Sequence, residues 1–491
     1  MLEKGKIYLG KGDAAQYLDL KIANRHGLIA GATGTGKTVT LRNLAEGFSA
    51  AGVPVFVADV KGDLTGISTA GRHDGKPFLA KRAEAIGFSD QYQFSGFPTL
   101  YWDLFGEQGH PTRATVSEMG PMMLARLLDL TDAQEGVLNV AFSVADDEQL
   151  MLLDLKDLRA MLTFVADHAK DLRDTYGNVS SSSVGAIQRD LLVLENQGAE
   201  HFLGEPALDL NDFIRSDFSG HGVVNLLAAN KLMQSPKLYA TFLLWLLSEL
   251  FEELPEIGDP DKPKIVFFFD EAHLLFDDAP DALVDKITQV VRLIRSKGVG
   301  VYFITQNPAD IPDDVLGQLG NRIQHALRAY TPKERKAIKA AAESFRENPS
   351  FKTETAITEL GIGEALVSTL GPDGVPSVVE RTLIRPPSSQ LDPLTPEALT
   401  EVRGRSPLKG KYDTMVDRES AYELLQARAE EQAKRKAEQA KVDEEEEARE
   451  PKRRGRRGDS LWEAAAKSVV RSAGRQIARR LIRGLLGSLL R

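Results

Sequence analysis

One short segment restricts the fold of this 491-residue chain more than any other, the sequence GATGTGKT at residues 31–38. It matches the pattern G-x-x-x-x-G-K-[ST] at every fixed position. The apolar run GLIA at 27–30 precedes it, and a helical pattern at 39–48 follows it. Glycines in such a loop let backbone N–H groups converge on phosphate oxygens at the start of a helix. The segment therefore predicts a strand, a phosphate-binding loop and a helix in that order.

The residues of this loop have separate expected tasks. We expect the ammonium of Lys37 to reach the β- and γ-phosphates of ATP, and the hydroxyl of Thr38 to ligate Mg²⁺. The pattern predicts that nucleotide is bound by Gly31, Ala32, Thr33, Gly34, Thr35, Gly36, Lys37, Thr38 and Val39. The alternative is a glycine-rich turn that matches by chance, and the flanking strand and helix argue against it.

Apolar runs that alternate with helical patterns extend from residue 26 to about 390. The strand candidates are 27–30, 53–58, 223–227, 265–269, 299–305 and 323–327. Several are apolar over nearly their whole length, as expected for strands that are buried on both faces of a parallel sheet. The order predicts an α/β fold with an open, mainly parallel sheet.

The remaining segments suggest how this core is elaborated. Residues 1–25 are expected to form a short β segment, and 26–70 with 221–390 the ATPase core. Between the two parts of the core, residues 71–220 contain helical patterns and predict a helical insertion subdomain. Prolines after 384 mark a linker, so 391–459 is expected to be a charged linker and helix, partly disordered.

The C-terminal segment differs in charge from the rest of the chain. Residues 451–491 hold twelve Lys and Arg against two acidic residues, whereas the whole chain has a net charge of −10. Within it, 460–491 shows apolar and basic rows at four-residue spacing, which predicts a basic amphipathic helix. Such a helix can pack on the chain's own acidic body or a partner protein, lie on an anionic membrane surface, or bind nucleic acid.

A second strand ends in paired carboxylates. The run KIVFFF at 264–269 is followed by Asp270 and Glu271. We expect Asp270 to hold Mg²⁺ and Glu271 to orient and deprotonate the attacking water. Residues 270–273 spell DEAH, but other motifs of the DEAD/DEAH-box helicases are not evident, and His273 is interpreted as structural.

Other polar residues follow apolar strands or the helices before them. Gln306 follows the run at 299–305 and is the candidate sensor of the γ-phosphate, although it could simply end the strand. Asp59, after the run at 53–58, could either contact the catalytic water or cap a turn. An arginine can stabilise phosphoryl transfer from a neighbouring subunit. The residues alone leave four candidates for that task open: Arg292, Arg295, Arg322 and Arg328.

Composition excludes several other classes. The chain has no cysteine, which rules out disulfides, thiolate zinc sites and cysteine catalysis. The N-terminus shows no apolar signal region, and no run of about 18 uncharged apolar residues is present. We therefore expect a cytoplasmic protein, with peripheral membrane association through the C-terminal helix as the alternative.

Together these motifs resemble the HerA/FtsK division of P-loop ATPases, and specifically HerA-like helicases. The resemblance covers about residues 20–385. Its motifs are GATGTGKT at 31–38, VADVKGD at 57–63, FFFDEAH at 267–273, RSKGVGVYFITQNP at 295–308 and NRIQHALR at 321–328. The text at 111–130 is similar to a bacterial HerA-like group.

The resemblance implies a RecA-like core, a homo-oligomeric and hexameric ring, and ATP sites at the subunit interfaces. It places Arg295 where the family carries its trans-acting arginine. The family also has a β-barrel ahead of the phosphate-binding loop, for which the residues before Gly31 leave no room. The resemblance therefore does not carry the family's nuclease partnership over to this chain.

Three functions fit these expectations. The first is an ATP-driven motor that translocates or remodels DNA. The second is an ATPase that remodels a protein or a membrane-associated complex. The third is a scaffold or switch that binds ATP but turns it over slowly, against which Glu271 and Gln306 argue.

Overall fold

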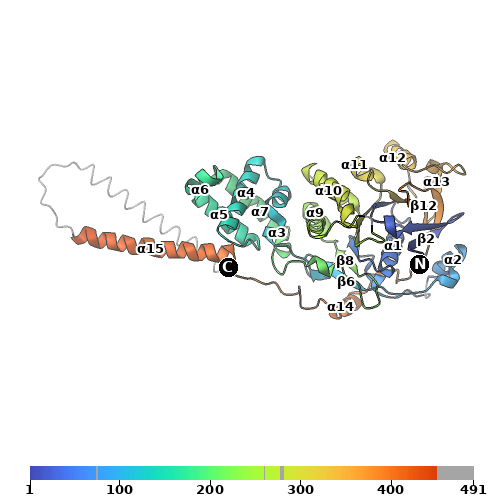
Figure 1. Cartoon of the computed structure of the whole chain (residues 1–491), viewed down its shortest axis with the longest axis horizontal. Coiled ribbons are helices and arrows are strands. Elements are labelled where there is room, and N and C mark those ends of the chain that lie inside the picture. The colour runs from blue at the N-terminus through green and yellow to red at the C-terminus, as the bar shows by residue number, and fades with distance from the viewer. Residues whose placement is uncertain (73–75, 259, 277–280, 450–491) are drawn as a thin grey trace. The chain divides into compact units, whose positions relative to one another are not determined.

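The computed structural model describes residues 1–449 apart from 73–75, 259 and 277–280. The chain divides into a compact unit, Met1–Gln426, and a second unit, Ala427–Arg491. The amphipathic helix expected at 460–491 lies outside the described residues. The account below therefore concerns the first unit, which carries the sheet, the phosphate-binding loop and the helical insertion (Figure 1).

The first unit alternates strands with helices for most of its length. The strands are β1 Leu2–Glu3, β2 Lys6–Lys11, β3 Ala15–Asp19, β4 Gly27–Ala30, β5 Val55–Asp59, β6 Thr99–Asp103, β7 His110–Pro111, β8 Val224–Ala228, β9 Ile265–Phe269, β10 Val299–Thr305, β11 Asn321–Gln324, β12 Glu364–Ser368 and β13 Glu380–Ile384. The helices are α1 Lys37–Ala50, α2 Pro77–Ala85, α3 Val116–Leu127, α4 Asp132–Asp147, α5 Leu155–Asp167, α6 Ala169–Tyr176, α7 Ser181–Asn196, α8 Ala199–Phe202, α9 Pro236–Glu253, α10 Asp281–Ile294, α11 Asp313–Leu316, α12 Pro332–Glu343, α13 Thr353–Glu359 and α14 Pro396–Gly404. A further helix, α15 Ala421–Arg449, begins in this unit and continues into the second.

All the strands of this unit belong to one sheet. Its order is β1-β2-β13-β12-β11-β4-β10-β9-β5-β8-β6-β7, with β3 paired to β2. The strands from β11 to β7 are parallel to their neighbours. The pairings from β11 out to β1, including that of β3, are antiparallel. The expected mainly parallel sheet is confirmed, and an antiparallel flank extends it.

The central strands are apolar throughout because both faces of the sheet are covered. On β9, Ile265, Phe267 and Phe269 belong to one core with residues of α9 and α10, whereas Val266 and Phe268 belong to another with residues of α1. Figure 1 shows α9 and α10 on one side of the sheet and α1 on the other. A strand buried on both faces cannot alternate apolar with polar residues, which explains the uninterrupted runs in the sequence.

The structure differs from two of the expected domain boundaries. Strands β6 and β7 lie within 71–220, the range predicted to be helical, yet β6 pairs with β8 and continues the sheet. The segment 1–25 is likewise part of the sheet, because β2 pairs with β13 from the far end of the core. The helical insertion proper therefore begins with α3, whose Thr115 forms a capping box with Glu118.

A third difference concerns the chain after residue 384, where prolines were expected to mark a linker and 391–459 was expected to be a charged linker and helix, partly disordered. Residues 385–420 instead pack against other parts of the first unit, and we call this segment the C-terminal strap. At its start the fully buried guanidinium of Arg385 lies 3.1 Å from the equally buried carboxylate of Glu46 on α1. Ser388 and Ser389 also donate to this carboxylate. The prolines of 385–393 therefore mark a change of direction and not the end of the ordered core.

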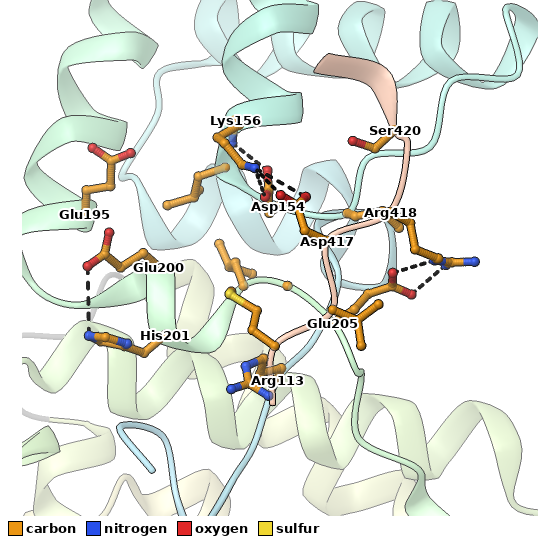
Figure 2. A pocket seen from close by; sticks show the side chains of 16 residues that line it. Arg113, Asp154, Lys156, Glu195, Glu200, His201, Glu205, Asp417, Arg418 and Ser420 are labelled. Carbon is orange, nitrogen blue, oxygen red and sulfur yellow. Dashed lines mark hydrogen bonds and ion pairs between the residues drawn. The ribbon is translucent and has the colours of Figure 1, made fainter. Parts of the chain in front are cut away.

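The far part of the strap holds the helical insertion. Tyr412 is buried, and its hydroxyl donates to Asp212 over 2.6 Å. A cavity of about 420 Å³ lies between residues 415–420 and the insertion. Figure 2 shows two ion pairs across this cavity, of Arg418 with Glu205 and of Lys156 with Asp417. These contacts fasten the end of the strap to the insertion.

Helix α9 is the most apolar of the long helices, and three acids, Glu249, Glu252 and Glu253, lie near its C-terminal end. Within the described ranges, no helix combines the length and apolarity needed to cross a bilayer. Glu249 is half-buried, and burial, followed by the charges of Glu118, Glu252 and Glu253, raises its pKa to about 7. The unfolded chain therefore releases this proton first as the pH rises, and the folded state loses stability between the ordinary pKa and about 7.

Replacing this acid should make the protein more stable in mild alkali. Because Glu249 is only partly buried, we expect Glu249→Gln to raise the unfolding free energy at pH 8 by only about 1 kcal/mol. At pH 5 the same variant should match the unsubstituted chain. Thermal unfolding at both pH values measures this, with Glu256→Gln as the control. An equal gain at both pH values would contradict the assigned ionisation.

Candidate active site

The phosphate-binding loop is held by the strands on both sides of β4. The N–H of Gly31 donates to Thr305 at the end of β10, and that of Ala32 donates to Ala326, just after β11. Gly31 has φ +150, and a Cβ there would lie 2.5 Å from the Cβ of His325. Gly36, at φ +114, caps the start of α1. Both glycines are therefore required by the backbone and by close packing, as the motif predicts.

A buried histidine forms the floor of this loop. The Nε2 of His325 lies 2.8 Å from the hydroxyl of Thr40 on α1. Burial is the main cause that lowers the pKa of His325 to about 4, so the ring is neutral at physiological pH. The ammonium of Lys37 donates to the carbonyls of Gly31 and Ala32, over 2.6 and 3.2 Å. The loop therefore surrounds the lysine that the sequence assigns to phosphate binding.

The two carboxylates expected after β9 lie at the same edge of the sheet. Asp270 and Glu271 are both buried, and the N–H of Glu271 donates to Asp270 over 3.0 Å. Glu271 has φ +47, a left-handed conformation that costs a non-glycine residue about 1–3 kcal/mol. Such strain persists where the surrounding structure fixes it, which is common at functional sites.

Glu271 contacts a residue that the sequence did not single out. The Nζ of Lys61 lies 2.5 Å from its Oε1. Burial alone would raise the pKa of Glu271, but the hydrogen bond and the charge of Lys61 reverse this and lower it. The local signal for this contact is limited to the positions of the two residues relative to the ends of their strands. Lys61 lies two residues beyond the end of β5, Glu271 lies two residues beyond the end of β9, and these strands are neighbours.

Asp270 has the opposite electrostatic environment. Burial first, and the charge of Glu271 second, raise its pKa to about 7. A divalent cation would relieve both effects, and a carboxylate together with a threonine hydroxyl offers the oxygen ligands that Mg²⁺ prefers. In the described part of the chain, no three histidine or carboxylate side chains gather as a metal cluster. Asp270 and Thr38 therefore fit a Mg²⁺ that is shared with a nucleotide.

The structure places the remaining polar candidates in two groups. Gln306 lies beside Glu271, with its Nε2 3.3 Å from Oε2. The Nδ1 of His273 lies 3.4 Å from the same oxygen, so this residue borders the site as well. Asp59 instead accepts from the N–H groups of Gly62 and Leu64. Asp59 was expected either to contact the catalytic water or to cap a turn, and the described contacts show that it caps a turn.

Three of the four candidate arginines line one cavity at the other end of β4. It has a volume of about 370 Å³, and its arginines are Arg25, Arg292, Arg295 and Arg322. Among the described residues that line it there is no aspartate or glutamate. Arg322 is fixed by bonds to the carbonyls of Leu316 and Leu319, and burial lowers its pKa. Arg328 lies apart and donates to the carbonyl of Thr358.

The order of the strands explains which residues come together. Since β4, β10, β9 and β5 are consecutive and parallel, their carboxyl ends bring Lys37, Gln306, Glu271 and Lys61 to one edge. The arginine cavity lies where β4 and β10 begin. The four residues of β4 span about 13 Å, so the cavity does not belong to the same edge.

The site combines a phosphate-binding loop after β4, a buried Asp-Glu pair after β9 and a glutamine after β10, the strand between them. These features define a P-loop ATPase with a RecA-like sheet. Within this class the sequence profile of the helicase HerA-like C-terminal family matches residues 5–491. The chain belongs to this HerA-like family, which confirms the resemblance seen in its motifs.

Individual relatives are distant in sequence. The DNA double-strand break repair helicase HerA of Pyrococcus furiosus is 22% identical over 371 residues, which cover 71% of this chain. The chain spans only 63% of the length of that relative. The bacterial conjugative coupling protein TrwBdeltaN70 is 14% identical with a TM-score of 0.50, over 79% of this chain and 92% of that chain.

A second solved structure is similar in fold and equally distant in sequence. VirB4 of Thermoanaerobacter pseudethanolicus is 14% identical with a TM-score of 0.50, over 78% of this chain and 97% of that chain. At these identities the two structures bear on the fold alone. They support the α/β sheet described above and leave the substrate to be argued from the residues.

Proposed function

We propose that this chain is a subunit of a cytoplasmic ring ATPase that hydrolyses ATP with Mg²⁺ and uses the energy to translocate or remodel DNA. The observation that carries the proposal is the meeting of Lys37, Glu271 and Gln306 at one edge of the sheet. In this arrangement Lys37 binds the phosphates, Glu271 orients and deprotonates the attacking water, and Gln306 holds Glu271 in place. Bound Mg²⁺ would neutralise the charge on the phosphates, held by Thr38 and Asp270.

The arginine cavity supports the ring. Arg295 lies at the opposite end of β4 from Lys37 and is therefore poorly placed to act on its own nucleotide. In a hexamer, the arginine cavity of one subunit could face the sheet edge of the next subunit that carries Lys37, which we call the nucleotide edge. Arg295 would then lie at the neighbour's phosphates.

Membership of the HerA-like family supports DNA as the substrate. Stimulation of the ATPase rate by DNA tests it. We expect the ATPase rate of the full-length chain to rise at least about fivefold with DNA at 50 mM salt, and the gain to shrink at 200 mM, because phosphate contacts release counterions. Phosphate release is measured without DNA and with single- and double-stranded DNA. Lys37→Ala gives the background rate.

The outcomes separate the competing functions. A rate that ignores DNA at low salt would refute the DNA motor and leave an ATPase that remodels another complex. A rate at the Lys37→Ala background in every condition, with ATP still bound, would instead indicate a nucleotide-dependent switch.

A further inference from the structure

Glu271 is held by neighbouring donors on both oxygens. The Nζ of Lys61 lies 2.5 Å from Oε1, and the Nε2 of Gln306 lies 3.3 Å from Oε2. His273 adds a ring nitrogen 3.4 Å from Oε2. A carboxylate that is paired with an ammonium at this distance is a weaker base toward water, because the ammonium stabilises its negative charge. The described arrangement therefore restrains the residue that is expected to act on water.

The two members of this ion pair differ in their freedom to move. The side chain of Glu271 is 5% exposed, whereas that of Lys61 is 42% exposed and ends a flexible four-carbon stem. If Lys61 moves away, Gln306 and His273 still contact Glu271. The lysine is therefore the partner that can leave, and the glutamate is the one that stays.

Hydrogen bonds fix the backbone on both sides of Lys61. Its ammonium can therefore move only as far as the side chain reaches. Asp59, before Lys61, accepts from the N–H groups of Gly62 and Leu64, after it. The carbonyl of Asp63 accepts from the buried Arg42 of α1. Burial lowers the pKa of Lys37, and the charge of Lys61 lowers it further, so the two ammonium groups lie within electrostatic range of each other. A phosphate that Lys37 binds would therefore lie within the electrostatic range of Lys61.

We propose that Lys61 is a positioning residue that distinguishes ATP from ADP. Its ammonium holds Glu271 while no γ-phosphate is present, and it moves to the γ-phosphate when ATP binds. This transfer releases Oε1 of Glu271, which then orients the attacking water. The inference rests on the proposed function, because it requires that ATP is hydrolysed at this site.

The first test compares two nucleotides on the full-length chain. Affinities for Mg²⁺-ADP and for Mg²⁺ with a non-hydrolysable ATP analogue are measured by calorimetry. Lys61→Met should weaken analogue binding at least about tenfold, as expected for one lost charge-assisted contact, and leave ADP binding within about twofold. Lys61→Arg keeps the charge and should keep the preference for the analogue.

Lys6 offers a matched control. Its side chain is 44% exposed and lies 3.6 Å from Asp19, so it resembles Lys61 in exposure and in having an acidic partner. Lys6→Met should change neither affinity. Thermal unfolding of each variant establishes that it is folded before its affinities are compared.

A double substitution tests the transfer itself. Glu271→Gln removes the resting partner of Lys61 and should raise the affinity for the analogue about tenfold. That gain should disappear in Lys61→Met with Glu271→Gln. The proposal is overturned if the gain survives without Lys61, or if Lys61→Met affects ADP and the analogue equally. Failure of the unsubstituted chain to bind either nucleotide would overturn the proposed function as well.

Discussion

The Glu271→Gln variant should bind ATP and hydrolyse it about 10³-fold more slowly than the unsubstituted chain. The substitution keeps the size of the side chain and its contact with Gln306 but removes the carboxylate that accepts the proton of the attacking water. Steady-state phosphate release at saturating ATP measures the loss, and binding of the ATP analogue shows that the site is intact.

Glu195→Gln is a suitable control for that measurement. Glu195 lies in the insertion on α7, where it pairs with Arg159 over 2.9 Å and is partly buried. Its substitution should leave the hydrolysis rate within twofold. If Glu271→Gln keeps more than a tenth of the activity, the group that activates water lies elsewhere in the site.

Arg295→Ala should lower hydrolysis by about 10³-fold, and mixing it with Lys37→Ala should restore part of the activity. Each variant alone lacks one half of every site in the ring. In a mixed ring, an Arg295→Ala subunit supplies an intact phosphate-binding loop and a Lys37→Ala neighbour supplies the arginine. With random mixing, about a quarter of the interfaces then contain both halves.

This experiment also separates Arg295 from the other arginines. Arg328→Ala should retain activity, because its guanidinium contacts the carbonyl of Thr358 away from the arginine cavity. Arg292→Ala and Arg322→Ala show which other residues of the cavity are needed. Assembled mixed rings without any recovered activity would mean that Arg295 serves its own subunit or only the fold.

Much of the nucleotide edge could be predicted because its signals are local. The bounds of β9 and β10 agree with the apolar runs at 265–269 and 299–305. A strand that is buried on both faces needs apolar residues whatever its neighbours are, and the turn after it needs glycine or polar residues. The positions of Lys37, Glu271 and Gln306 at the strand ends follow from these local rules.

The parts that were missed depend on contacts between distant segments. Strands β6 and β7 are short, and their place in the sheet follows from the pairing of β6 with β8, more than 100 residues later. The pairing of Lys61 with Glu271 requires that β5 and β9 be neighbours, which no local pattern states. The strap was interpreted as a linker because its prolines are local signals, whereas Arg385 and Glu46 meet only in the folded chain.

Because of the strap, a force applied to the chain would pass through the parts of this protein in a different order from their order in the sequence. Its first residues grip the helix that starts at Lys37, through Glu46, and its last residues grip the insertion, through Asp157 and Glu205. A load applied beyond the strap would therefore reach the insertion before any strand of the sheet. It would reach the nucleotide site only afterwards, through Glu46 on α1, the helix whose first residue is Lys37.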